Sequence, residues 1–376
     1  MRILALNAGS RSVKAQLLEV DAASRPEAPQ APAWSGERLY RDDSTGVAQA
    51  VRGLLADLGA MRFDVAAHRV VQTATVPRAA AVPFDASLTA DIEAAMGLAP
   101  LHSRAVLATK AAFDAERPAV AQFGVFDSAF HRTIPERAAV FSGPYAWYES
   151  GLRKIGYHGL SYAYCAARAR AELGTAASER LICAHLGGGC SLAAIAGGVS
   201  IETTMGYTPL DGVTMVSRSG SLDPGLVLHL LRSGRYSLDE LDRVLNEDSG
   251  VRGLAGDSGD LRDVRAAAKS GSARALLALD VFTYRIRCAI GALSAALGGL
   301  DALAFTGGIG KHDAETRAEI CAGLGYLGIV LDPTRNTAGG DGARIEASAR
   351  SMPVLVLQTH EEWIMALAVR DAGNPA

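Results

Sequence analysis

Two stretches of the chain share one pattern of apolar and small polar residues, and each predicts a strand, a tight turn and a second strand. They cover residues 3–20 and 182–196. Set 179 residues apart, they match at Gly9 and Gly188 and again at Ser12 and Ser191. Glycine lets backbone N–H groups approach an anion closely, and hydroxyls add donors. Two such turns, one in each half, predict a duplicated ATP-binding α/β fold with a cleft between the halves.

Elsewhere, short buried strands alternate with segments of helical periodicity, which is typical of α/β proteins. Further strands are predicted at residues 65–72, 120–126, 302–306 and 354–358. Helices are predicted at residues 47–58, 86–98, 103–115, 161–173, 225–233, 238–246, 260–269, 272–297 and 361–370. We expect an exposed connection at residues 21–36 and a long loop at 203–224.

A Gly-, Pro- and Tyr-containing break at residues 142–152 marks the expected domain boundary. We expect an N-terminal domain of residues 1–148 plus 362–376 and a C-terminal nucleotide-binding domain of residues 149–361. The first domain is discontinuous because the last helix is expected to pack back on it.

Composition narrows the class of protein. The 376 residues are 49% apolar and carry a net charge of −3, with no basic run that would indicate a nucleic-acid partner. No apolar run approaches the roughly 20 residues of a membrane helix, and the N-terminus does not resemble a signal peptide. We therefore expect a cytoplasmic protein with neither nucleic-acid nor membrane partners.

The five cysteines show no C-x-x-C pair and predict neither a disulfide framework nor a zinc site. We expect them to be reduced and buried. No H-E-x-x-H or G-x-S-x-G motif occurs, which weakens zinc-protease and serine-hydrolase interpretations. Magnesium needs only a carboxylate, such as Glu361, besides ATP phosphates.

Two glycine turns are candidates for phosphate or nucleotide contacts. Residues 187–191 form GGGCS, which alone is equally typical of a tight hairpin, and His185 precedes them as a candidate phosphate contact. Residues 305–310, FTGGIG, follow a strand and open a helix, so their backbone is available to a flat ligand or a phosphate. A purely structural strand–helix turn is the alternative. The turn matches neither a dinucleotide fingerprint nor a Walker A motif.

Arg69, Asp127, His158 and Arg218 lie in four segments, each near a predicted strand end or a glycine turn. Phosphoryl transfer needs cations around the equatorial oxygens of the moving group, which two arginines and a histidine would supply. Any single arginine of this Arg-rich chain is equally typical of a surface ion pair, so spacing alone leaves these roles open.

Several longer motifs occur in an order and spacing that resemble the acetate kinase-like (acetokinase) family over residues 3–365. They are NAGSRSVK at 7–14, HRVV at 68–71, LAPLH at 98–102, VFDSAFH at 125–131, YHGLSY at 157–162, AHLGGGCS at 184–191, MGYTPLDG at 205–212 and SRSGSLDPG at 217–225. The resemblance implies duplicated actin-like ATPase domains, with mixed sheets flanked by helices, and a homodimer. It also implies direct, in-line transfer of a phosphoryl group between ATP and a short carboxylate.

Residue roles follow from the same resemblance. Asn7 and Glu361 are expected to hold Mg²⁺, with Mn²⁺ as the alternative. The residues expected at ATP are Lys14, His185, Leu186, Gly187, Gly188, Gly189, Asp260, Leu261, Arg262, Gly308, Ile309, Gly310, Lys311 and His312. Those expected at the substrate are Arg69, for the carboxylate, and Val71, Leu101, Tyr157 and Pro209, for the acyl group.

Three residues are expected to act in catalysis besides Arg69. His158 and Arg218 are expected to stabilise the transition state, and Asp127 is the catalytic carboxylate. The acceptor carboxylate is already ionised near pH 7, so no general base is required. We therefore expect Asp127 to orient an arginine or a magnesium-bound water.

The chain departs from the family pattern at residues 72–74 and 103–105, beside Arg69 and the acyl pocket, and at Gly188 and Lys311. The departures at residues 72–74 and 103–105 bear on the acyl-chain length of the substrate. Those at Gly188 and Lys311 bear on the choice of phosphate donor. We expect an acetate kinase, a phosphotransferase with a carboxyl acceptor. A propionate- or butyrate-type kinase is the alternative, followed by a non-catalytic nucleotide-binding protein.

Overall fold

The computed structural model describes residues 1–9, 12–40, 44–74, 79–256 and 258–373, with the backbone alone at residues 100 and 101. The chain divides into two compact units. The N-terminal unit is Met1–Arg132 with Tyr157–Arg168 and His360–Ala376, and the C-terminal unit is Thr133–Gly156 with Ala169–Thr359. The domain limits expected from the sequence stay a prediction.

The N-terminal unit is built on a six-stranded sheet in the order β3-β2-β1-β4-β6-β5. Its strands are β1 (Arg2–Ala8), β2 (Ser12–Glu19), β3 (Trp34–Leu39), β4 (Val65–Val70), β5 (Ala81–Pro83) and β6 (Ala121–Phe126). Strands β1, β4 and β6 run parallel, whereas β2, β3 and β5 pair antiparallel with their neighbours. Parallel strands end at the same edge of the sheet, where open α/β folds place their sites.

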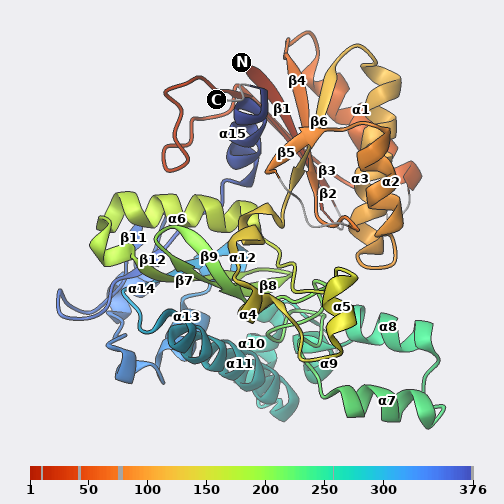
Figure 1. Cartoon of the computed structure of the whole chain (residues 1–376). Coiled ribbons are helices and arrows are strands. Elements are labelled where there is room, and N and C mark those ends of the chain that lie inside the picture. Colours follow the sequence, from red (N-terminus) through yellow and green to blue (C-terminus); the bar gives the residue numbers. More distant parts are fainter. Residues whose placement is uncertain (10–11, 41–43, 75–78, 257, 374–376) are drawn as a thin grey trace. The chain divides into compact units, whose positions relative to one another are not determined.

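Helices cover both faces of this sheet, which explains why β1 is buried from Ile3 to Ala8. The helices are α1 (Ser44–Leu58), α2 (Ala86–Ala94), α3 (Pro100–Glu116) and α15 (Glu361–Gly373). Leu4 and Leu6 of β1 pack with Leu54 of α1 and Phe113 of α3. In Figure 1, α15 lies on the other side of the sheet from α1 and α3. The expectation that the last helix packs back on the first part of the chain is confirmed.

The C-terminal unit repeats this topology in a sheet of order β11-β12-β10-β7-β8-β9. Its strands are β7 (Arg180–Leu186), β8 (Cys190–Ala196), β9 (Val199–Thr203), β10 (Ala302–Thr306), β11 (Ala343–Arg344) and β12 (Val354–Val356). Strands β7, β10 and β12 are parallel, and the other three are antiparallel to their neighbours. Read from β9 to β11, the second sheet has the same strand order and the same strand directions as the first sheet read from β3 to β5. The predicted duplication is therefore confirmed.

The remaining helices surround the second sheet or form its connections (Figure 1). They are α4 (Glu136–Ala139), α5 (Tyr145–Glu149), α7 (Pro224–Arg232), α8 (Leu238–Glu247), α9 (Gly250–Ala255), α10 (Leu261–Lys269), α11 (Ala273–Leu297), α12 (Gly307–His312), α13 (Ala314–Cys321) and α14 (Pro333–Ala338). Helix α6 (Gly159–Leu173) begins in the N-terminal unit. Among the described residues, no helix combines the length and hydropathy that a membrane span requires.

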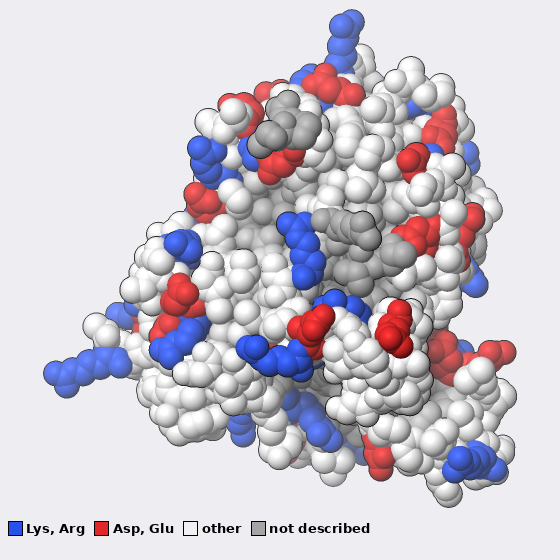
Figure 2. Space-filling view, viewed as in Figure 1, with Lys and Arg blue, Asp and Glu red and all other residues white. Residues whose placement is uncertain are grey.

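Some local expectations were wrong. The predicted exposed connection at 21–36 ends in the start of β3. Cys288 is exposed, whereas the other four cysteines are buried as expected. Lys14, expected at ATP, belongs to β2, where it pairs with Asn7 of β1 and is exposed. On the face drawn in Figure 2, basic side chains are scattered among acidic ones.

Candidate active site

A cluster of polar side chains lies where the parallel strands of the N-terminal unit end. Asn7 is near the end of β1, Arg69 is near the end of β4, and Asp127 directly follows β6. The Arg69 guanidinium contacts the Asp127 carboxylate at 2.8 Å and the side-chain oxygen of Asn7 at 3.2 Å. Three residues that are far apart in the sequence therefore form one hydrogen-bonded group.

Helix α15 adds two carboxylates to this group. The Asn7 Nδ2 donates to Glu361 Oε2 at 3.1 Å and to Glu362 Oε1 at 2.9 Å, and Glu361 lies 3.5 Å from the Arg69 guanidinium. The helix is anchored by the buried Trp363, whose indole N–H donates to the Arg25 carbonyl at 2.9 Å. Glu361 thus reaches the end of β1 because its helix is packed against the same sheet.

The segment that carries His158 also binds Asp127. The backbone N–H of His158 donates to Asp127 Oδ2 at 3.0 Å, and the Gly159 N–H donates to the Asp127 carbonyl at 2.7 Å. Among the described residues, His158 is the only non-glycine residue with a positive φ, +59°. A strained backbone of this kind persists only where surrounding contacts hold it. Asp127 therefore positions both Arg69 and the turn at His158.

Arg69 is a charged group in a largely buried place. Burial alone would lower its pKa, but the Asp127 and Glu361 carboxylates outweigh burial and raise the pKa of Arg69 above its ordinary value. The Nε of Arg69 has no hydrogen-bond partner in the described part of the chain. The cluster therefore holds a permanent cation, fixed in place by the carboxylates around it.

Of the residues predicted for the acyl group, Val71 and Tyr157 are buried in the N-terminal unit, at 6% and 1% exposure. The Tyr157 hydroxyl donates to the side-chain oxygen of Gln72. Pro209 belongs to the C-terminal unit. The side chain of Leu101 and all of Ser10 lie outside the described residues.

In the C-terminal unit, two glycine turns lie beside each other. Strand β10 runs parallel to β7 with Thr306 opposite His185, so the turns that follow both strands share one edge. A Cβ on Gly187 would lie 3.9 Å from the Gly308 backbone nitrogen, whereas one on Gly188 or Gly308 would meet no atom within 4 Å. Open backbone of this kind suits close approach by an anion.

Gly307 keeps the second turn close to the first. Its φ is +77°, and a Cβ there would come within 2.5 Å of the Leu186 carbonyl oxygen. The turn after β10 can therefore approach the end of β7 only with glycine at this position.

Arg218 lies near the first of these turns, in the long loop before α7. Its guanidinium lies 3.4 Å from the Pro209 carbonyl oxygen and, among the described residues, makes no ion pair with a carboxylate. Burial lowers the pKa of Arg218 and raises the pKa of the neighbouring Cys190 thiol to about 12. Arg218 is thus a largely buried cation that pairs with no carboxylate in the part of the chain that the structure describes.

The sequence profile of the acetokinase family matches residues 2–367. The chain belongs to this family. It is 40% identical to the acetate kinase of Gloeobacter violaceus, over 97% of this chain and 98% of that protein. With the acetate kinase of a Cyanothece strain it shares 41% identity over 97% of each chain.

Solved structures agree with the acetokinase assignment. The Porphyromonas gingivalis acetate kinase superposes with a TM-score of 0.84 at 33% identity, covering 99% of this chain and 100% of that one. A propionate kinase from Francisella tularensis gives 0.85 at 31% identity and 98% coverage of both chains. The predicted fold class, duplicated actin-like ATPase domains with mixed sheets flanked by helices, is confirmed.

Other residues predicted to bind ATP in this acetokinase are paired with neighbouring residues or are buried. Asp260 caps α10 and pairs with the exposed Arg262 at 2.5 Å, which lowers the pKa of Asp260 to about 2. Leu261 is buried beside them. Lys311 donates to Gln358 at 2.5 Å. Lys14 is paired with Asn7 in the β1–β2 ladder, but among the described residues its side chain makes no hydrogen bond or ion pair with the polar cluster.

Sequence reasoning missed a buried cation behind the second glycine turn. Arg317 donates to the carbonyls of Gly310 and Lys311 at 2.9 and 2.8 Å, and its other nitrogens bind Asn336. Asn336 in turn donates to the Ala314 carbonyl at 2.8 Å. Arg317 therefore holds the C-terminal end of α12, although its place in a mixed helical pattern gave no signal of this role.

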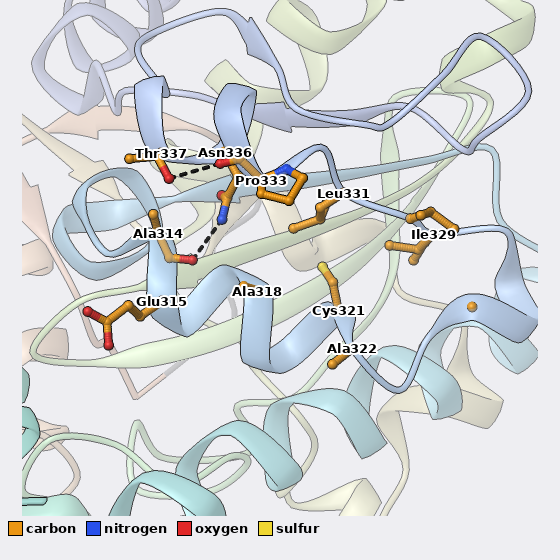
Figure 3. Close-up of a pocket in the computed structure, with 12 residues that line it drawn as sticks. Ala314, Glu315, Ala318, Cys321, Ala322, Ile329, Leu331, Pro333, Asn336 and Thr337 are labelled. Carbon is orange, nitrogen blue, oxygen red and sulfur yellow. Dashed lines mark hydrogen bonds between the residues drawn. The ribbon is translucent and has the colours of Figure 1, made fainter. Parts of the chain in front are cut away.

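A cavity of about 470 Å³ lies on the far side of Asn336. Figure 3 shows Ala318 and Cys321 of α13 facing Leu331 and Pro333 across it. Its one carboxylate, Glu315, is already paired with Arg265 and Lys269. The cavity contains none of the residues predicted for catalysis or substrate binding.

Gln72, Glu362 and Gly250 were also missed as contributors to the site. Gln72 binds Tyr157, Glu362 binds Asn7, and Gly250 supports the turn that ends at Arg218. The departure from the family pattern at residue 72 was the one available signal in the sequence. It indicated this region but not the hydrogen bond between Gln72 and Tyr157.

Proposed function

We propose that this chain transfers the γ-phosphoryl group of ATP to acetate, reversibly, giving acetyl phosphate and ADP. Its membership of the acetokinase family and the acetate kinases among its relatives support the reaction. The structural observation that carries the proposal is the buried Arg69, paired with Asp127 and Glu361 where three parallel strands end. A guanidinium held in this way suits charge-assisted hydrogen bonding to a small carboxylate.

In this proposal Arg69 binds the acceptor carboxylate and Asp127 holds the guanidinium in place. The acceptor is ionised near pH 7, so it attacks phosphorus without a general base. His158 and Arg218 stabilise the charge on the transferring group, which is the main demand of phosphoryl transfer. Val71, Leu101, Tyr157 and Pro209 surround the methyl group.

The groups proposed for ATP are the two glycine turns and their flanking residues. Residues 185–189, with Lys14, bind the phosphates. The nucleoside is bordered by residues 260–262 and 308–312. The open space around the Cβ positions of Gly188 and Gly308 supports this assignment, because side chains there would occupy space that ATP needs.

The residues near Asn7 fit a magnesium ion. Asn7, Glu361 and Glu362 offer the amide and carboxylate oxygens that Mg²⁺ prefers, and no cluster of three His, Cys, Asp or Glu ligands occurs among the described residues. A site with so few protein ligands suits an ion that also binds ATP phosphates. When bound, Mg²⁺ would neutralise phosphate charge, and Mn²⁺ is the alternative ion.

We also propose a homodimer in the cytoplasm. Helix α7 buries none of its residues in the chain, and Leu226 and Leu228 on it are 44% and 47% exposed. Leu277 and Tyr284 of α11 are also exposed. Such apolar surface is typical of subunit contacts. None of the five cysteines forms a disulfide, which suits a reducing compartment.

The direct test is hydroxamate-coupled detection of acyl phosphate with Mg-ATP and acetate, propionate, butyrate or glycerol in parallel. We expect turnover with acetate that falls as the acyl chain lengthens, and none with glycerol. An optimum at propionate or butyrate would replace the proposed substrate. ATP binding with no turnover on any carboxylate would refute the enzyme itself.

A further inference from the structure

Gln72 and Tyr157 form a hydrogen bond that the proposed chemistry does not use. The Tyr157 hydroxyl donates to Gln72 Oε1, and Gln72 Nε2 donates to the Thr73 carbonyl at 3.1 Å. Tyr157 is 1% exposed and Gln72 is 3% exposed, so water cannot replace either partner of the bond. Leaving a buried polar group without its partner is unfavourable. The bond therefore fixes the phenol ring in one position.

The same bond joins the two segments on which the proposed acceptor site depends. Gln72 lies three residues after Arg69 and directly after Val71, and Tyr157 lies directly before His158. The Tyr157 carbonyl is held separately, 2.9 Å from the His131 Nε2. With the Tyr157 backbone anchored at one end and the hydroxyl at the other, the ring cannot move away from a ligand that touches it.

We propose that Gln72 is a positioning residue that sets the acyl-chain length of the acceptor by fixing the Tyr157 ring. This inference rests on the proposed function. Acetate places only a methyl group beside the ring, whereas propionate and butyrate need the ring to shift or tilt. Such a shift would break the bond between two buried polar groups.

The size of the effect follows from the cost of that bond. Discrimination by one methylene in an apolar pocket is worth about 1–3 kcal/mol, or roughly 10–200-fold. The energy of the Gln72–Tyr157 bond is of the same order. Breaking the bond should therefore lower the acetate-to-butyrate ratio of kcat/KM by about tenfold.

The test uses the full-length chain and two variants that break the bond from opposite sides, Gln72→Leu and Tyr157→Phe, together with the double variant. We expect each single variant to lower the acetate-to-butyrate ratio of kcat/KM about tenfold, chiefly by lowering the KM for butyrate. The double variant should lower the ratio no further, because one bond cannot be lost twice.

A matched control separates positioning from simple destabilisation. Gln122→Leu also removes a glutamine of the N-terminal unit, one that lies on β6 and whose Nε2 donates to Asp114 Oδ1 at 2.6 Å. We expect this variant to lose stability while keeping the wild-type selectivity ratio. The double variant replaces both polar groups with apolar ones, so it remains informative if a single variant folds poorly.

Three outcomes are distinguishable. If wild-type enzyme turns over carboxylates but all Gln72 and Tyr157 variants keep the wild-type ratio, the positioning role is refuted and the proposed function stands. If the wild-type chain phosphorylates no carboxylate, the proposed function is refuted, and the positioning role that rests on it is refuted too. Additive losses of selectivity in the double variant would also overturn the shared bond as the cause.

Discussion

Two largely buried arginines of the candidate site differ in how their charge is balanced. Arg69 is paired with Asp127 and Glu361, whereas the described residues offer Arg218 no carboxylate. An ion pair within the chain holds a side chain in one geometry, and an uncompensated buried cation favours an external anion. We therefore infer that Arg69 is built for orientation and Arg218 for binding charge that arrives with the substrate.

Replacing Arg218 by alanine tests this distinction. We expect kcat to fall roughly a hundredfold, or about 3 kcal/mol, because a charge contact in the transition state is lost. The free energy of unfolding should stay within about 1 kcal/mol, since no ion pair is broken. Steady-state kinetics and urea unfolding measure both quantities. Arg243→Ala, which removes an exposed arginine paired with Asp248, is the control and should leave kcat unchanged.

His68, next to Arg69, predicts a pH dependence of stability. It is fully buried between the rings of Phe84 and Phe113, and burial lowers its pKa from 6.5 to about 4, with Gln122, Lys110 and Asp114 contributing less. Because its folded pKa is depressed, the unfolded chain binds the proton more readily between pH 4 and 6.5. The stabilisation from neutral His68 is therefore complete above pH 6.5 and is lost as the pH falls.

For this one group, we expect the free energy of unfolding to be about 2 kcal/mol lower at pH 5 than at pH 7. A His68→Gln variant cannot take up that proton. Urea titrations at the two pH values should show a smaller difference in the variant than in the wild type. Equal differences in both proteins would contradict the role of His68.

At the scale of elements, the start of α9 supports the turn that ends at Arg218. The N–H groups of Ser249, Val251 and Arg252 donate to the carbonyls of Ser217, Met215 and Val216 at 2.9–3.0 Å. Gly250 lies among them with a φ of +62°, and a Cβ there would overlap the carbonyl oxygens of Met215 and Arg218. Glycine at this position therefore allows α9 to pack directly on the turn.

We expect Gly250→Ala to displace that turn and to lower kcat at least tenfold. Gly234→Ala is the matched control, because Gly234 has a similar φ of +67° but open space around its Cβ position. The control should lose about 1–2 kcal/mol of stability from left-handed backbone strain and keep its kcat. Turnover measured beside thermal unfolding separates strain from displacement. Equal kcat values in the two variants would contradict the positioning of Arg218 by α9.

The sequence predicted long or strongly periodic elements better than short ones. Helix α11 and the hairpins β1–β2 and β7–β8 were predicted because their apolar period extends over enough residues. Strands β5 and β11, of three and two residues, and the six-residue helices α9 and α14 carry too little periodicity. They form because neighbouring strands and helices satisfy their backbones.

At the scale of the whole molecule, the two units repeat one sheet topology and carry different chemistry. The N-terminal unit contains the Arg69 cluster, and the C-terminal unit contains both the β7–β8 glycine turn and Arg218. A duplicated fold thus supplies two versions of the same strand edge. The edge in the N-terminal unit carries carboxylates, and the edge in the C-terminal unit carries glycine turns whose backbone is accessible.

Ligand binding is expected to stabilise the folded chain. Mg-ATP at a hundred times its Kd should add about 2.7 kcal/mol to the free energy of unfolding and raise the unfolding temperature. Excess EDTA should abolish acyl phosphate formation and most of this shift, and added Mg²⁺ should restore both. Glu361→Gln should need more Mg²⁺ for half-maximal activity, whereas Glu149→Gln, an exposed residue of α5, should not. Unchanged Mg²⁺ dependence in Glu361→Gln would remove Glu361 from the metal site.

The sequence alone determined the strand–turn–strand repeats, the main helices, the return of α15 and the family. These depend on local periodicity and on motifs that are contiguous in the chain. Only the tertiary structure decided which side chains meet. Asn7 reaches Glu361 across 354 positions and Tyr157 reaches Gln72 across 85. Such pairs depend on how sheets and helices pack, and the spacing of residues along the chain does not record that packing.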